Sequence, residues 1–502
     1  MAKTRTEFEP ADHVEPTGPP ATPLSEEPVG SRWLRPDRVF LVLALVFGFC
    51  VVAITQPEAG GDERDHFARA YQIALGQPFT VRNPTGATGY GAMFSRGLAR
   101  DLETLADVAW VDRDRSAFLD HLGDPAPTGR PVFVDLNNSA SYGPGAFVPH
   151  IVGIEIGRVL GTSTLVRLYL ARLLGLLAYA LLIAAAIRRT PWHPWVFVIC
   201  GLLPAVLGQG ATVNADSLTI ALSFFVTASA LRMTAFPEAI KRRDLVEVGA
   251  AGVVLGLGKP PYMALLLLLL IPAWRDRRRL AKPVLALIGT VGALAALWAA
   301  YQSTHSIPQD DPRRWLSGTF GYAFHDLDPG RQLSHLLTHP VWFVTVVART
   351  FWAGGWDSFR ELAGGMGSWL MPAPLVIACL ALVALAARQA RPSSTPPLDR
   401  ATRACLLAVS VTIGLAVLVI AYTNWNAYLA PRIDAVNPRY AFPLLPAFLL
   451  GVLPVAPRLG TRAATVRVAV LSAGIATVLA VTTVMLVEWH LTGAPIFTRA
   501  TS

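Results

Sequence analysis

The sequence predicts an all-α polytopic membrane protein with about 11 transmembrane helices, in a range of about 10 to 13. Three observations predict this fold class. First, 53% of the 502 residues are apolar and only 15% are charged, whereas soluble domains carry about 25% charged residues. Second, apolar runs such as 39–54, 165–187 and 406–421 approach or exceed the roughly 18 residues that indicate a transmembrane helix. Third, arginines gather in short clusters between these runs, as the positive-inside rule describes.

The net charge of +9 raises the alternative of a nucleic-acid-binding protein. The chain has no stretch in which basic and aromatic residues are interleaved and no nucleic-acid-binding motif, so we expect no nucleic-acid partner. No Walker loop, dinucleotide fingerprint or nucleophile elbow indicates another class of enzyme. Four cysteines lie inside apolar runs without metal-ligand spacing, which favours small hydrophobic residues in helices: Cys50, Cys200, Cys379 and Cys405.

The chain begins with a polar segment and continues as alternating apolar runs and short basic loops. Residues 1–31 are rich in Pro, Glu and Thr and predict a disordered cytoplasmic tail. Arg32, Arg35 and Arg38 precede the first span, which indicates a retained signal anchor with a cytoplasmic N-terminus. The predicted spans are 38–56, 166–187, 193–210, 214–232, 245–258, 261–274, 281–301, 370–388, 403–422, 440–456 and 466–488.

The segment 141–160 decides the topology, because it is apolar yet carries charged residues. If it crossed the membrane, the pair Arg188-Arg189 would fall outside. We therefore expect a juxtamembrane helix lying on the outer side, a choice that places the arginine clusters of five loops inside. The predicted parts are a module at 32–301 with an outer loop at 57–165, a second outer loop at 302–369 with one interfacial or re-entrant helix over 331–352, C-terminal helices at 370–488 and a short outer tail at 489–502. No internal repeat favours a repeat-built transporter.

Polar residues that persist at one predicted membrane face are the candidates for chemistry, because they are costly at membrane depth. Asp62, Glu63 and His66 follow the first span. Asp62 and Glu63 fit equally well as the cap and first-turn acids of a helix over 63–75. Acids and a histidine on one helical face also suit a general base or a divalent metal, although two residues do not make a metal site. No metal ligand set and no definite cofactor are therefore predicted.

Two cations and one further acid are predicted at the same face. Lys259, in Gly258-Lys259-Pro260, and Arg439, in Pro438-Arg439-Tyr440, suit phosphate contacts, or act only as snorkelling residues at turns. Asp216 starts the fourth span and caps it in the alternative interpretation. The Asp-x-Asp of Asp112 and Asp114 lies in a charged loop and carries no weight.

These motifs resemble a bacterial family of predicted membrane proteins, catalogued as domain of unknown function 2142. The opening motif is Asp62-Glu63, His66-Phe67, Arg69-Ala70-Tyr71-Gln72 and Gly76. The resemblance covers about residues 38–456 and continues at Tyr142-Gly143-Pro144, Arg172-Leu173, Asn214-Ala215-Asp216, Gly258-Lys259-Pro260 and Pro438-Arg439-Tyr440. Gly60-Gly61 stands where the family usually has prolines, and Met371 stands where an Asp is usual.

That family is similar to the GT-C superfamily of multispanning glycosyltransferases, such as the protein O-mannosyltransferases and the lipid A aminoarabinose transferases. The resemblance implies a GT-C-like fold in the bacterial plasma membrane. It also implies transfer of a sugar from a polyprenyl-phosphate donor to a cell-envelope glycan, lipid or protein acceptor at the outer face. Asp62 would be the base, with Glu63 next and His66 orienting a carboxylate or contacting phosphate. The expected substrate-binding residues are Lys259, Arg439, Tyr440, Arg69 and Asp216. The alternatives are a transporter or flippase of lipid-linked saccharides and a non-catalytic envelope-assembly protein.

Overall fold

The computed structural model describes residues 34–57, 60, 62–84, 90–110, 117–304, 328–364, 371–387, 395–433, 436–453 and 461–492. Several predicted features lie outside these residues. They are the tail at 1–31, the Asp-x-Asp of Asp112 and Asp114, residues 305–327 of the second outer loop, and residues 493–502 of the outer tail.

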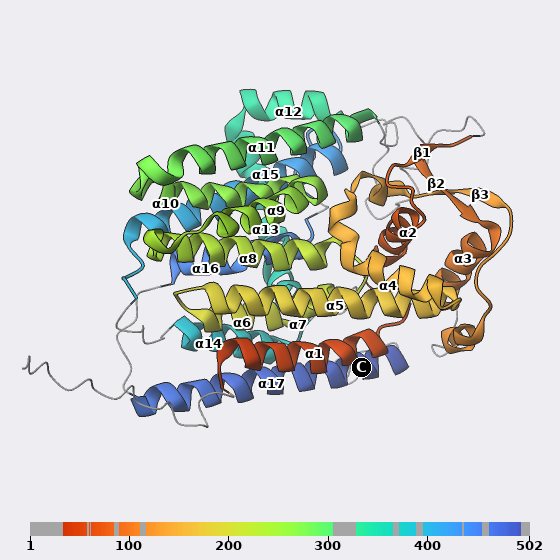
Figure 1. Cartoon of the computed structure of the whole chain (residues 1–502), viewed down its shortest axis with the longest axis horizontal. Coiled ribbons are helices and arrows are strands. Elements are labelled where there is room, and N and C mark those ends of the chain that lie inside the picture. Colours follow the sequence, from red (N-terminus) through yellow and green to blue (C-terminus); the bar gives the residue numbers. More distant parts are fainter. Residues whose placement is uncertain are drawn as a thin grey trace, which may run out of the picture.

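Long apolar helices form the body of the protein and lie side by side along its long axis (Figure 1). Among the described residues, six helices are long and apolar enough to cross a membrane. They match the predicted spans 38–56, 166–187, 214–232, 281–301, 403–422 and 466–488. These helices are α1 (Pro36–Ile54), α5 (Thr164–Arg189), α8 (Ala215–Ala235), α11 (Arg277–Thr304), α15 (Arg400–Trp425) and α17 (Thr461–Thr492). A mostly helical fold with several membrane-spanning candidates is therefore confirmed.

The other five predicted spans correspond to short or interrupted helices. Prolines account for the interruptions, because proline lacks the N–H that continues a helix and clashes with the preceding turn. Pro204 separates two short helices, and Pro260 follows the end of another. A total of eleven spans thus stays a prediction. The elements concerned are α6 (Pro194–Leu202), α7 (Pro204–Gly210), α9 (Arg242–Gly258), η6 (Pro260–Leu269), α10 (Leu270–Arg275), α14 (Ala373–Ala387), η9 (Pro438–Leu444) and α16 (Leu445–Val452).

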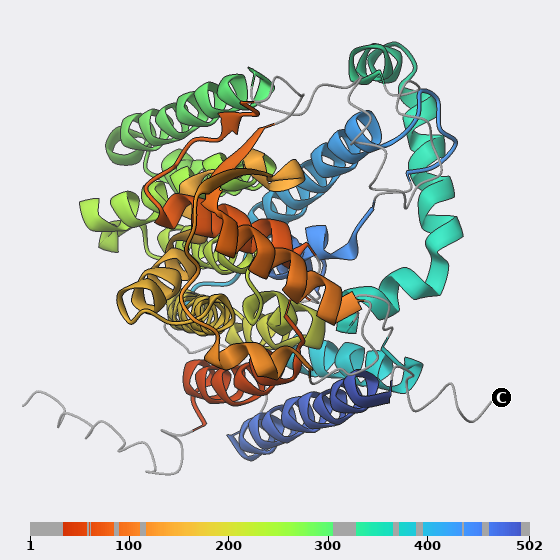
Figure 2. The same ribbon diagram turned by 90° about the vertical axis from the view of Figure 1, so that its right-hand side faces the viewer.

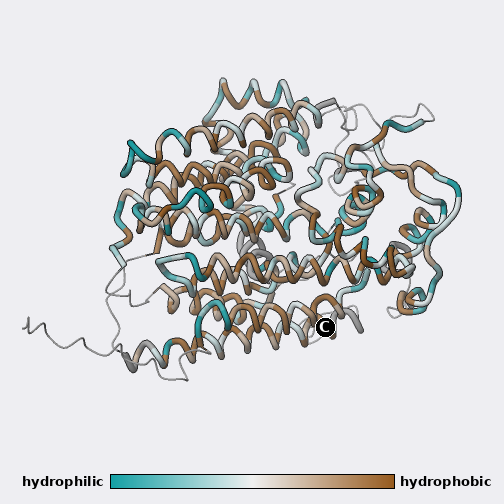
Figure 3. The backbone as a smooth tube through the Cα atoms, in the orientation of Figure 1, coloured by the Kyte–Doolittle hydropathy of each residue, from teal (hydrophilic) through white to brown (hydrophobic). Residues whose placement is uncertain are grey.

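The distribution of apolar side chains separates a central helix from peripheral ones. Almost every residue of α8 is buried, whereas Val42, Val46 and Phe49 on α1 are 53–57% exposed. Exposed apolar residues also lie along the surfaces of α11, α15 and α17. Figure 3 shows that apolar residues colour the long helices along most of their length, while polar residues gather toward their ends. Contiguous exposed apolar faces on helices of this length fit a lipid environment.

A mixed segment covers one end of the helical body, at the right of Figure 1 and facing the viewer in Figure 2. It contains a three-stranded antiparallel sheet in the order β1-β2-β3, in which Gly91 pairs with Asp135 and Ser95 with Pro131. The sheet is a difference from the all-helical prediction. The elements of this segment are α2 (Glu63–Ala74), β1 (Val81–Arg82), β2 (Tyr90–Ser95), α3 (Arg96–Trp110), η2 (Ala117–Gly123), β3 (Pro131–Asp135), η3 (Asn137–Ser141), η4 (Pro144–Phe147) and α4 (Val148–Val159).

The helix α4 lies where the sequence predicts a juxtamembrane helix at 141–160. Its 12 residues rise about 18 Å, well short of the roughly 30 Å of a hydrocarbon core. It packs closely on α5, since a Cβ at Gly153 would lie 2.5 Å from the carbonyl oxygen of Leu170. The predicted helix over 331–352 is two helices instead, α12 (Pro329–Thr338) and α13 (Pro340–Gly364), because Pro340 begins a new helix. A 3-10 turn, η5 (Pro237–Ala239), links α8 to α9.

Candidate functional site

The start of α2 places Asp62 in an uncommon backbone conformation. Asp62 occupies the N-cap position with a φ of 63°, in the left-handed region. Aspartate and asparagine tolerate this region better than most residues, at a cost of roughly 1 kcal/mol. The Asp62 side chain makes no capping hydrogen bond. Its Oδ2 accepts a 2.5 Å hydrogen bond from Nη2 of Arg439, which is 377 positions away in the chain. Asp62 therefore stands at the N-cap position, as the alternative interpretation expects, but its side chain binds Arg439 and does not cap the helix.

Glu63 points the other way, into the protein. Its carboxylate accepts hydrogen bonds from Nε of Arg172 at 2.8 Å and from Nη2 at 2.6 Å, and both side chains are fully buried. Glu63 Oε1 also accepts the backbone N–H of Val213 at 2.8 Å. Arg172 in turn donates to the carbonyl oxygens of Val52, near the end of α1, and of Thr55 and Gln56, which follow α1. Glu63 therefore joins α2 to α5 and to the chain before α8, away from solvent.

A chain of ion pairs links Asp62 to two cations and a second acid. Arg439 lies between the two acids, with its Nε 3.8 Å from Oδ2 of Asp216. Lys259 donates a hydrogen bond from Nζ to Oδ1 of Asp216. Asp216 does not cap α8, because Asn214 does so by accepting the N–H of Ser217 at 2.8 Å. The structure thus brings together Asp62, Arg439, Asp216 and Lys259, which come from four separate segments.

Local sequence accounts for the position of Lys259. Its helix, α9, ends at Gly258, and Pro260 starts a 3-10 helix, so Lys259 stands at the turn between them. The chain around Tyr142 packs on this turn, since the N–H of Gly143 donates to the carbonyl oxygen of Leu257 at 3.1 Å. A Cβ at Gly143 would lie 2.8 Å from that oxygen, so only glycine permits this approach.

Aromatic rings surround the cations. Nζ of Lys259 lies 5.8 Å from the ring centre of Tyr142 and 5.5 Å from that of Tyr440, distances at which a cation is attracted to a ring face. Tyr440 is fixed in place because the hydroxyl of Tyr262 donates to its carbonyl oxygen at 2.7 Å. These rings reduce the access of water to the ion pairs.

His66 lies buried beside the same residues. Its ring centre is 5.1 Å from that of Tyr142 and 5.7 Å from that of Phe147. Burial, followed by the positive charges of Lys259 and Arg439, lowers the pKa of His66 to about 3, so the ring is neutral near pH 7. In the described part of the chain, its Nδ1 has no hydrogen-bond partner. His66 is placed to act as a neutral donor or acceptor at the edge of the ion pairs.

The acids of this segment have shifted proton affinities in opposite directions. Burial alone would raise the pKa of Asp62. The charge and the hydrogen bond of Arg439 together outweigh burial, so the pKa is lowered overall. Burial, together with the charge of Asp62, raises the pKa of Asp65 to about 6. Asp62 therefore remains a carboxylate held by a cation, whereas Asp65 takes up a proton near pH 6, above the usual range of an aspartate.

Arg69 is not placed at the ion pairs. It is buried and donates to the carbonyl oxygens of Tyr142 at 3.2 and 3.1 Å and of Pro78 at 2.9 Å, and it also donates to Gln72. These bonds hold α2 to the chain at either end of the sheet. By binding the carbonyl oxygen of Tyr142, Arg69 fixes the position of the tyrosine whose ring faces Lys259.

Two contributors were not singled out as site residues by the sequence. Tyr142 and Arg172 both occur in the motifs of the resemblance, yet their residue types alone indicate no role. A buried arginine in an apolar run is a signal for an acidic partner, because an unpaired buried charge is very costly. No group of three or more His, Cys, Asp or Glu side chains is gathered as a metal site within the described residues.

Comparison with known proteins agrees with the resemblance of the motifs. Residues 45–448 match the model of a family described as predicted membrane protein (DUF2142). No curated protein and no solved structure matches the chain. The matched region includes Asp62, Glu63, Asp216, Lys259 and Arg439. Because this region covers most of the 502 residues, the chain belongs to the DUF2142 family of predicted membrane proteins.

Proposed function

We propose that this protein is a GT-C-like glycosyltransferase of the bacterial plasma membrane. It would take a sugar from a polyprenyl-phosphate donor and transfer it to a hydroxyl of a cell-envelope glycan, lipid or protein at the outer face. The observation that carries the proposal is the chain of ion pairs from Asp62 through Arg439 and Asp216 to Lys259. It joins a candidate base to two candidate phosphate ligands at one end of the apolar helices.

The cluster is electrically balanced, with two acids and two cations, so an arriving phosphate must displace a carboxylate. The exposures of the side chains indicate which one. Asp62 is 58% exposed, whereas Asp216 is 1% exposed. Asp62 can therefore turn toward water at little cost, but a displaced Asp216 would be left as a buried, unpaired charge. We expect the donor phosphate to take the place of Asp62 on Arg439.

This exchange would convert Asp62 into a better base. While Arg439 holds it, the pKa of Asp62 is below its ordinary range. When the phosphate binds the guanidinium of Arg439, Asp62 loses the charge that stabilised its carboxylate, and the pKa of Asp62 rises. A carboxylate with a higher pKa accepts a proton more readily. The base would thus become effective only when the donor is bound.

The transfer step then follows from these positions. The acceptor hydroxyl oxygen attacks C1 of the sugar while its proton passes to Asp62. The bond between C1 and the phosphate oxygen breaks, and the electron pair leaves with the phosphate. Lys259 and Arg439 stabilise the charge that develops on this leaving group. Guanidinium and ammonium groups in a site lined by Tyr142 and Tyr440 are more effective than in water, because the local dielectric constant is lower.

The roles of the other predicted residues are revised in this proposal. Glu63 acts as a structural residue, because its carboxylate is buried against Arg172. Arg69 positions Tyr142 and does not bind phosphate. His66, neutral and adjacent to Tyr142, orients the donor or acceptor by a hydrogen bond. The isoprenoid tail would lie against apolar helix surfaces, where burial contributes about 25 cal/mol per Å².

The test is a comparison of lipid-linked sugars and envelope glycans in cells with the protein, without it, and with Asp62→Asn. The proposal expects donor accumulation and loss of one glycan modification in both the deletion strain and the variant. A purified protein that moves lipid-linked saccharides across vesicles without consuming donor would identify a flippase instead. Normal glycans in the Asp62→Asn strain, with the deletion still defective, would exclude Asp62 as the base and so remove the observation that favours an enzyme over a non-catalytic assembly protein.

A further inference from the structure

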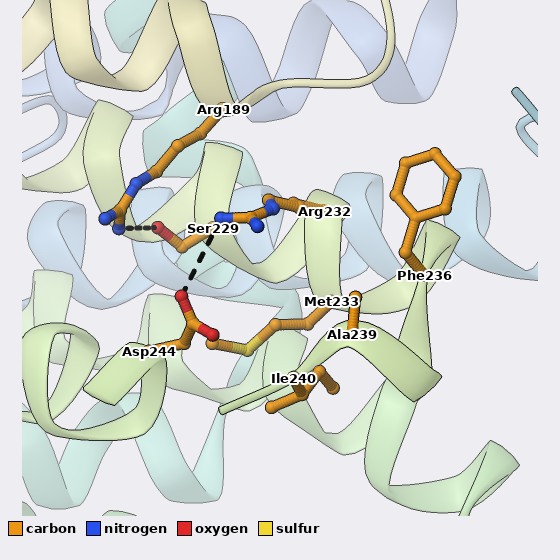
Figure 4. A pocket seen from close by; sticks show the side chains of 8 residues that line it. All are labelled: Arg189, Ser229, Arg232, Met233, Phe236, Ala239, Ile240 and Asp244. Atoms are coloured by element: carbon orange, nitrogen blue, oxygen red, sulfur yellow. Dashed lines mark hydrogen bonds and ion pairs between the residues drawn. The ribbon is translucent and has the colours of Figure 1, made fainter. Parts of the chain in front are cut away.

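The opposite end of the helical body carries a second polar region, which we call the arginine hollow. Its narrow part, with a volume of only about 10 Å³, is lined by Arg189, Ser229, Arg232, Met233, Phe236, Ala239, Ile240 and Asp244 (Figure 4). Its larger part, with a volume of about 350 Å³ and thus room for a phosphate group, shares Arg189, Arg232 and Phe236 with the narrow part. Arg188, Thr190 and Thr395 also line this larger part. Together they form one concave region at the ends of α5 and α8.

The cations of the arginine hollow are only partly neutralised. Nη1 of Arg232 is 3.7 Å from Oδ1 of Asp244, which is longer than a hydrogen bond, and the Arg232 side chain is 44% exposed. Arg188 is 58% exposed, and its ion pair with Asp37 is long, at 4.0 Å. Among the described residues, the lining of the larger part includes three arginines and no acid. Their guanidinium groups therefore keep hydrogen-bonding capacity for an anion.

Arg189 is the fixed member of this group. It forms an ion pair with Glu247, donates from Nη1 to Oγ of Ser229 at 3.2 Å, and stacks over the ring of Phe225 at 4.3 Å. Figure 4 shows Arg189, Ser229, Arg232 and Asp244 pointing toward one another across the hollow. A pre-positioned arginine beside a half-exposed, loosely paired one suits the bidentate binding of a phosphate.

The surroundings indicate the class of ligand. Phe236, Met233 and Ile240 give the hollow an apolar side, and both parts of the hollow lie at the ends of helices with membrane-spanning length. Basic pockets between such helices are suited to the head groups of anionic lipids. We propose that the arginine hollow binds a phosphate group, independently of the ion pairs around Asp62. The source would be an anionic phospholipid or a free phosphate.

The experiment measures binding of fluorescent phosphatidylglycerol to the purified full-length protein in a neutral detergent. Arg232→Gln removes a guanidinium from the hollow, and we expect binding about tenfold weaker. Arg278→Gln is the matched control, because Arg278 is an exposed arginine that does not line either part of the hollow. It should leave the binding unchanged. Asp244→Asn removes the competing carboxylate and should tighten binding, a gain that a misfolded variant would not show.

Competition then distinguishes the two sources of phosphate. Displacement of the lipid by inorganic phosphate or pyrophosphate at similar concentrations would assign the site to a free phosphate. Displacement only by other anionic phospholipids would assign it to a lipid head group. Equal loss of binding in Arg232→Gln and Arg278→Gln would mean general attraction to basic loops and would overturn the proposal. So would the absence of saturable binding.

Discussion

Glu63 and Arg172 form a fully buried ion pair with two parallel N–H···O bonds, although they are 109 positions apart. Arg172 also binds the last carbonyl oxygens of the first span, and Glu63 begins α2. The pair therefore fixes the angle at which the chain leaves α1 and enters the segment that carries Asp62. It separates two adjacent carboxylates into one structural acid and one solvent-facing acid.

Glu63→Gln should destabilise the protein without abolishing transfer. Removing one partner leaves a buried, uncompensated arginine, at a cost of about 3–5 kcal/mol. We expect a lower thermal transition and less folded protein, while activity per folded molecule persists. The control is Glu155→Gln, which breaks the partly exposed Glu155–Arg158 pair and should cost about 0–1 kcal/mol. A stable but inactive Glu63→Gln protein would return Glu63 to the list of candidate bases.

Asp62→Asn should remove transfer and leave the fold intact. Asparagine tolerates the left-handed conformation as well as aspartate does, and the Asp62 side chain is half-exposed. The amide cannot accept the acceptor proton, so we expect activity to fall by about 100-fold or more. The measurement is sugar transfer by purified protein, with the thermal transition recorded alongside.

Asp65→Asn is the matched control for this change, because it removes a carboxylate from the same turn of α2 that is not part of the ion pairs. It should retain transfer. Comparable activity in Asp62→Asn and wild type would exclude Asp62 as the base. Loss of activity in both variants alike would instead indicate that the net charge of this helix end matters, and not the position of Asp62.

Lys259→Met should weaken donor binding and stability together. It removes a charged contact to phosphate, which corresponds to about tenfold weaker binding or more. It also leaves Asp216 buried, with only Arg439 nearby at 3.8 Å. The double variant Lys259→Met/Asp216→Asn removes both charges and should recover the thermal transition but not the donor affinity. An unchanged KM for donor in Lys259→Met would count against the phosphate role.

Part of the fold is readable from the sequence because hydropathy and charge act locally. The six long helices fall on predicted spans, and the prolines that interrupt the others, such as Pro204 and Pro260, are visible in the sequence. The sheet was not predicted. Its middle strand, Tyr90–Ser95, is short and contains Gly91, so its pairing with Pro131–Asp135 depends on the fold around it.

The candidate site was partly predictable for the same reason. The topology predicted from the sequence puts Asp62, Asp216, Lys259 and Arg439 at one membrane face, and the structure brings all four together. The different roles of Asp62, which is solvent-facing, and Glu63, which is buried and structural, were not predictable. Both are acids at the start of one helix, and only the distant partners Arg439 and Arg172 distinguish them. Contacts between residues this far apart follow from the folded chain and not from local pattern.

Asp65 provides a pH test of the same helix end. Its pKa in the folded protein is raised from 3.8 to about 6 by burial, together with repulsion from Asp62. A raised pKa means that the folded state binds the proton more tightly than the unfolded state. The associated stability is fully present below about pH 4 and is lost as the pH rises through 6. Ionised Asp65 therefore costs on the order of 3 kcal/mol at pH 8.

Asp65→Asn keeps the size of the protonated acid and removes the ionisation. We expect the variant to unfold at a higher temperature than wild type at pH 8, and the two to converge at pH 4. The measurement is the thermal transition in detergent at a series of pH values and constant ionic strength. A difference that is independent of pH would show that Asp65 does not titrate in this range. In that case neither burial nor the charge of Asp62 raises the pKa of Asp65 into this range.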